Sequence, residues 1–141
     1  MTDQRTGDEL PDGPIDCGGC GHSYWPGSDD RGRCSVCRAR EIVALVIAER
    51  QRQVDAEGYT PAHDDQHVGG ELALAAASYA QPPGARAHFN WKDTGRMAGA
   101  PQTWPGRHWQ WKPDGDRVRE LVKASALILA EIDRLLRKDG V

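Results

Sequence analysis

The stretch that decides the fold is DRVRELVKASALILAEIDRLLRK, residues 116–138. Its mostly aliphatic stripe recurs at intervals of three and four residues, a spacing that places these side chains on one face of a helix. The stripe consists of Val118, Leu121, Val122, Ser125, Ile128, Leu129, Ile132, Leu135 and Leu136. Asp114 or Asp116 can cap the first turn. Because alanines and Leu127 add apolar surface on the other side, we expect this to be the central helix.

Two more helices are predicted upstream. The first spans 38–57, where an apolar face that includes Val46 continues into the polar residues Glu49 and Gln53. The second spans 71–80 and is rich in alanine. Residues 84–115 have no helical period but contain four tryptophans, and HWQWK within them alternates like a short strand. The predicted fold is mainly α, a three-helix domain at 38–141 with a long Trp-rich loop.

Composition limits the protein class. The 141 residues are 38% hydrophobic and carry a net charge of −3, so one small domain plus a compact module is the expected organisation. Residues 1–16 hold five acids against one arginine and are predicted to be a disordered acidic leader. The remaining chain is therefore nearly neutral, which disfavours nucleic acid as the main partner. No run of apolar residues is long enough for a membrane span, and the N-terminus does not resemble a secretion signal.

The four cysteines form two CxxC pairs, Cys17–Cys20 and Cys34–Cys37, within the module at 17–37. This doubled spacing is typical of a tetrahedral zinc site in a zinc ribbon or treble-clef-like module. Such a closed site would stabilise the fold and would not catalyse a reaction. Two disulfides and a redox-active CxxC are the alternatives, and His22 could replace one of the sulfur ligands.

A dense polar run follows the first predicted helix and suggests a pocket against the Trp-rich loop. Aromatic side chains there could stack on a ring, and cationic ones could receive phosphate or carboxylate. The candidate ligand-binding residues are Arg50, Gln53, Tyr59, His63, Asp64, Asp65, His67, Trp104, Arg107, Trp109, Trp111 and Lys112. Two alternatives remain open: the tryptophans are core residues, and the charged groups are helix caps and salt bridges.

The segment AERQRQVDAEGYTPAHDDQHVGGELALAAASYA (48–80), followed by WP, WKP and RELVKASALILAEIDRL (119–135), resembles a family of small bacteriophage and prophage proteins. The similarity covers residues 42–138. The order of Ala48, Arg50, Gly58, Tyr59, Thr60, Asp64, Asp65, Lys112 and Asp116 also resembles the ryanodine-receptor (Ryr) domain, although that pattern has an extended, Pro-containing stretch where this chain has its alanine-rich helix. The Ryr resemblance implies a helical recognition module and not an enzyme.

These resemblances lead to three functional hypotheses. The first is a phage-type accessory module in the host cytoplasm that binds a nucleotide-like anion or a host protein, which could interfere with host defence. The second is a nucleotide pyrophosphohydrolase similar to the MazG type, in which Mg²⁺ or Mn²⁺ is held by Glu49, Glu57, Asp64 and Asp65. The third is a zinc-ribbon nucleic-acid or transcription adaptor, based on arginines around the second CxxC pair. A homodimer is compatible with each of them.

Overall fold

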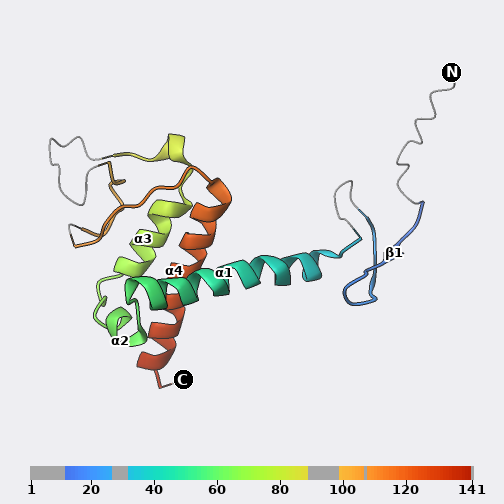
Figure 1. Cartoon of the computed structure of the whole chain (residues 1–141), viewed down its shortest axis with the longest axis horizontal. Coiled ribbons are helices and arrows are strands. Elements are labelled where there is room, and N and C mark those ends of the chain that lie inside the picture. Colours follow the sequence, from blue (N-terminus) through green and yellow to red (C-terminus); the bar gives the residue numbers. More distant parts are fainter. Residues whose placement is uncertain (1–11, 27–31, 89–98, 107, 141) are drawn as a thin grey trace. The chain divides into compact units, whose positions relative to one another are not determined.

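The computed structural model describes residues 12–26, 32–88, 99–106 and 108–140 and is mainly helical, as the sequence predicts (Figure 1). The chain divides into two compact units, Met1–Ala44 and Leu45–Val141. The division falls inside the first helix, whereas the sequence suggested a boundary after residue 37. None of the helices in the described ranges is both long enough and apolar enough to cross a membrane.

The first unit contains a minimal hairpin and the start of a helix. Strands β1 (Ile15–Asp16) and β2 (Ser23–Tyr24) pair antiparallel, with Ile15 opposite Tyr24. Helix α1 (Ser35–Glu57) begins within the second CxxC pair, three residues earlier than predicted, and continues into the second unit. Three cysteines and the Tyr24 ring form the small buried cluster of this unit, in place of an aliphatic core.

The second unit is built on helices α2 (Pro61–Asp64), α3 (Glu71–Ala80) and α4 (Arg117–Lys138), with a short 3₁₀ turn, η1, at Pro83–Ala85. Helix α3 has the predicted bounds. The Asp116 side chain accepts hydrogen bonds from the N–H groups of Val118 and Arg119 and so caps α4, one of the two caps that the sequence allowed.

Helices α3 and α4 lie side by side and form the main helix pair (Figure 1). Small side chains at the contact allow the two backbones to approach closely. Aromatic rings then close one end of this core, where Trp111 stacks on Tyr79 at a centroid distance of 4.7 Å. The core comprises Leu72, Ala75, Ala76, Tyr79, Ala100, Trp104, Trp111, Ala124, Leu127 and Ala130.

The orientation of α4 is opposite to the expectation for a central helix. The alanine side, which includes Ala124 and Ala130, is buried. The aliphatic stripe faces outward, and most of its side chains are 40–62% exposed. Likewise, Leu45 of α1 is exposed, although Val46 is buried as predicted. The periodicity identified the two faces correctly, but it could not show which face α3 would cover.

A buried ionic network joins the end of α3 to the start of α4. Glu120 is fully buried and accepts hydrogen bonds from Arg86 at 2.7 Å and Arg117 at 3.1 Å. The same arginines donate to backbone oxygens of the last turn of α3, including Tyr79 O. They therefore satisfy carbonyls that have no partner within the helix.

Residues 99–106 and 108–115 are irregular, and the alternation of Trp109 and Trp111 does not produce a strand. The described chain offers no neighbouring strand there, apart from an isolated bridge between His88 and Pro101. The rings instead point into different surroundings: Trp111 is buried in the core, whereas Trp109 is half-buried at its edge.

Candidate functional site

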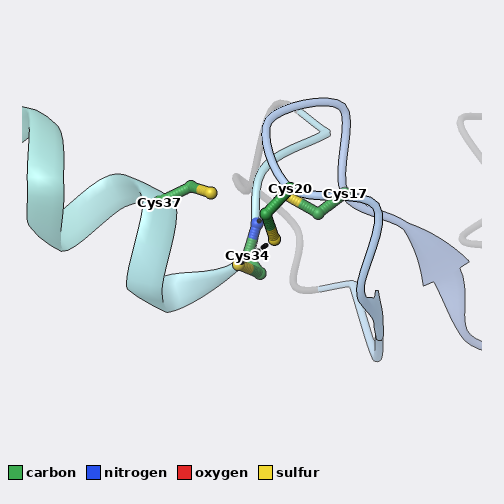
Figure 2. A group of neighbouring side chains, drawn as sticks. All are labelled: Cys17, Cys20, Cys34 and Cys37. Atoms are coloured by element: carbon green, nitrogen blue, oxygen red, sulfur yellow. Dashed lines mark hydrogen bonds between the residues drawn. The ribbon is translucent and has the colours of Figure 1, made fainter.

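The four cysteines of the first unit converge on one point (Figure 2). Cys17 and Cys20 come from the turn between β1 and β2, Cys34 precedes α1, and Cys37 lies in its first turn. All four Sγ atoms lie within 4.8 Å of one another. The Cys20 and Cys34 sulfurs are 3.7 Å apart, against about 3.8 Å for two thiolates on one tetrahedral zinc ion.

All four cysteines are free, so the disulfide alternative is wrong for this structure. The Cys17 sulfur accepts hydrogen bonds from the N–H groups of Cys34 (3.3 Å) and Gly19 (3.4 Å), which lower the pKa of Cys17 to about 6. The pKa of Cys37 is raised to about 12 by its hydrogen bonds to the neighbouring thiols and by burial. Four thiolates this close together would need a cation among them, so the cluster is compatible with a structural metal site. His22 is exposed and is not part of this group.

The second unit contains a cavity of about 190 Å³ between α1, α4 and the segment after Pro101. Seven of the candidate residues named above for ligand or metal binding lie on its wall: Glu49, Gln53, Glu57, Tyr59, Trp104, Trp109 and Lys112. The two glutamates belong to the metal-dependent hypothesis and the others to the ligand pocket. The same cavity is lined by Arg52, Tyr79, Gln110, Arg119, Lys123 and Leu127.

Arg52 holds the two carboxylates of the cavity wall. It donates two hydrogen bonds of 2.8 Å to Glu49 and one of 2.9 Å to Glu57. Burial opposes ionisation of both glutamates, but these bonds and the positive charge of Arg52 outweigh it and lower the pKa of each. Lys112 lies 3.7 Å from Glu57 on the other side. Both carboxylates are therefore ionised and already neutralised at neutral pH.

Gln53 is the unsatisfied member of the wall. Its side-chain Nε2 donates to Glu49 over 3.3 Å, but its Oε1 is buried and has no hydrogen-bond partner among the described residues. The residue is only 4% exposed. A buried carbonyl oxygen without a donor costs about 1–3 kcal/mol, and Gln53 is one of the residues that line the cavity.

Aromatic rings form the remaining wall. The Trp109 centroid lies 6.3 Å from that of Tyr59 and 6.2 Å from that of Trp104. Trp104 Nε1 donates to the backbone oxygen of Trp109 over 2.9 Å, which fixes the segment that carries both rings. Burial raises the pKa of Tyr59 to about 12, so its hydroxyl stays protonated and remains a donor.

Several predicted ligand residues are engaged elsewhere. Asp64 is completely buried and ion-paired with Arg50, while Asp65 accepts two 2.8 Å bonds from Arg137. Trp111 belongs to the core. None of these lines the cavity. Both aspartates therefore form ion pairs in this structure, as the salt-bridge alternative expects.

Two predicted histidines stack beside the cavity without lining it. His63 stacks on Tyr59 at 5.0 Å and meets the His67 edge at 4.8 Å, and His67 in turn contacts Trp109 at 4.7 Å. Burial lowers the pKa of His67, which favours its neutral form. Arg107 lies outside the described residues.

The four carboxylates of the metal-dependent hypothesis do not form one cluster. Glu49 and Glu57 pair with Arg52, whereas Asp64 and Asp65 pair with arginines of α1 and α4. Within the described part of the chain, the four-cysteine group is the one cluster of His, Cys, Asp or Glu side chains placed to hold a metal ion. This geometry gives no support to a magnesium or manganese centre.

Sequence reasoning did not propose three of the polar residues that line the cavity as ligand-binding residues: Tyr79, Arg119 and Lys123. Tyr79 donates to Lys112 O over 3.2 Å, and Lys123 Nζ lies 5.6 Å from the centre of the Tyr79 ring. The sequence did contain a signal for Lys123. This lysine lies one turn before the buried Leu127, a spacing that indicates a cation on the core side of α4.

Comparisons with protein-family models, curated proteins and solved structures found no match to this chain. The phage-family and Ryr resemblances therefore stay predictions. The site has to be interpreted from its own chemistry.

Proposed function

We propose that the second unit is a binding module for a small nucleotide-like anion. The observation that carries this proposal is the unpartnered Oε1 of Gln53 in a cavity walled by Tyr59, Trp104 and Trp109. A flat ring that carries N–H donors complements both features, since it can stack on the aromatic side chains while donating to the glutamine oxygen.

The charge of the wall favours an acidic group on that ring. Among the described residues, four cationic side chains line the cavity, against two carboxylates. Arg52 is occupied by the carboxylates, whereas Lys112 and Arg119 are largely exposed and can turn toward a ligand. A phosphate would satisfy these cations through charge-assisted hydrogen bonds. A ring at Gln53 and a phosphate at the cationic rim is the arrangement of a mononucleotide.

The size of the cavity limits the ligand. A volume of about 190 Å³ lies below the roughly 300–1,000 Å³ of most drug-sized sites, so a single base with its sugar phosphate at the opening fits better than a dinucleotide. The module would bind and not hydrolyse, because its carboxylates are held by Arg52 and are not free to coordinate a catalytic metal ion.

For the first unit, we propose a structural zinc ion held by Cys17, Cys20, Cys34 and Cys37 in a treble-clef-like module. Hairpin turn and helix start each supply two sulfurs, and a closed set of four thiolates contributes folding energy. Elemental analysis should give one zinc per chain. Chelation should increase amide exchange in residues 12–44 before it affects α3 and α4.

Isothermal titration calorimetry with the four ribonucleoside monophosphates, the matching nucleosides and inorganic phosphate tests the binding proposal. We expect one monophosphate to bind best, and Trp109→Ala to weaken it roughly 5- to 150-fold through loss of stacking. Trp25→Ala is the matched control because this tryptophan is 73% exposed in the first unit. Absence of binding for all monophosphates would reject the proposal.

A further inference from the structure

The outward face of α4 carries a regular apolar seam, defined by Val118, Leu121, Ser125, Ile128, Ile132 and Leu135. Successive seam residues are spaced by three and four positions without interruption, which is the heptad spacing of helices that pack along their length. Five of the six are large aliphatic residues, each 43–62% exposed. We propose that this seam binds the same seam of a second copy of the chain, independently of the ligand proposed above.

No described residue of its own unit covers the seam. Helix α3 covers the opposite side of α4, where Ala124, Leu127 and Ala130 are buried. The second half of α1 lies against a neighbouring side and leaves two apolar grooves, of about 400 and 430 Å³. One runs between Leu45 and Val118, and the other between Val54 and Leu129, so the apolar surface extends beyond the seam on both sides of α1.

The area is that of a dimer interface. Eight large aliphatic side chains of this surface are 40–62% exposed: Leu45, Val118, Leu121, Ile128, Leu129, Ile132, Leu135 and Leu136. Together they present on the order of 700 Å², more than the roughly 300–600 Å² of the largest apolar patch on a typical monomer. This value is close to the roughly 800 Å² that each partner buries in a stable complex.

A second copy suits the seam better than an unrelated helix. A two-fold interface requires a patch that complements itself, and a heptad seam does so. Ser125, the smallest seam residue, lies near its midpoint, where two crossing helices approach most closely.

The burial pattern supports the same conclusion. The described core of the second unit depends on alanines and aromatic rings, with Leu72 and Leu127 as its large aliphatic members. More large aliphatic residues therefore lie outside this core than inside it. Pairing of two seams would remove these side chains from water without any rearrangement of α3 or α4.

Sedimentation equilibrium of the full, zinc-loaded chain tests the proposal at about 1–100 µM. We expect a species of about 31 kDa, twice the 15.5 kDa chain. The double variant Ile128→Glu/Leu135→Glu should dissociate at least 100-fold more readily while retaining its helical circular dichroism. Leu74→Glu is the matched control, because Leu74 is 42% exposed on α3, away from the seam, and should leave the dimer intact.

A wild-type monomer at about 100 µM would overturn the proposal, as would an undiminished dimer of the seam variant or equal disruption by Leu74→Glu. Should the double variant fail to fold, hydrogen exchange of the wild type decides. Dilution should deprotect the α4 amides at a concentration where α3 remains protected, whereas exchange independent of concentration would overturn the proposal.

Discussion

Replacing Gln53 with methionine separates a ligand acceptor from a structural residue. Methionine keeps the length and flexibility of glutamine but removes both its amide groups. In the folded protein, Gln53 Oε1 is buried without a donor, and Nε2 makes a single 3.3 Å bond to Glu49. Glu49 retains its two 2.8 Å bonds from Arg52, so the substitution leaves no new unpaired group behind.

The two effects on stability oppose each other. Removing an unsatisfied buried oxygen is favourable by about 1–3 kcal/mol, and losing one long bond to a charged acceptor costs about 1.5 kcal/mol. The free energy of unfolding should therefore change by less than about 1.5 kcal/mol in either direction. Affinity for a ring that donates to Oε1 should instead fall by about 1–3 kcal/mol, or roughly 5- to 150-fold.

Urea unfolding and calorimetric titration measure the two quantities on the same preparation. Gln51→Met is the matched control, since Gln51 is exposed on the same helix and bonds to Asp55 one turn away. Unchanged affinity in Gln53→Met would refute the role of this oxygen in binding. A loss of stability above about 3 kcal/mol would refute the view that its amide is unsatisfied in the free protein.

Two further substitutions test the metal module and the buried ionic network. Gly19→Ala should weaken zinc affinity roughly tenfold in a competition titration, because a Cβ there would lie 3.0 Å from Cys37 Sγ. Gly18→Ala is the control and should have no effect, because its Cβ would make only an ordinary contact of 3.6 Å. Glu120→Gln should cost about 2–4 kcal/mol at neutral pH. Burial opposes ionisation of Glu120, but the hydrogen bonds from Arg86 and its other donors outweigh it and hold the pKa of Glu120 below the ordinary 4.5. The stability difference between wild type and variant should therefore be at its maximum above pH 4.5 and shrink as the pH falls. Equal stability losses at pH 3 and pH 7 would contradict that assignment.

Local patterns were sufficient for elements whose cause is local. The α3 bounds, the Asp116 cap and the cysteine cluster all follow from side chains within a few residues of one another or from a fixed ligand spacing. Helix α1 begins three residues before its predicted start, because a single turn of helix accommodates the second CxxC pair. The candidate pocket was also indicated in advance, since Gln53, Tyr59 and Trp109 do line one cavity.

Pairing between charged groups could not be predicted from the sequence. Asp64 and Asp65 are adjacent, yet one is buried against Arg50 and the other bonds to Arg137, seventy-two positions away. Whether a carboxylate is free for a metal ion or neutralised depends on such distant partners, because Coulomb attraction acts through space and not along the chain.

The sequence by itself therefore determined a helical chain with two apolar-faced long helices, an alanine-rich third helix and a four-thiol cluster. Only the tertiary structure decided that α3 packs on the alanine face of α4 and leaves the aliphatic seam outside. Periodicity fixes which residues share a face. The choice of buried face depends on the packing of small side chains such as Ala75 and Ala124 in one core and on the Glu120 network, which form only when distant segments meet.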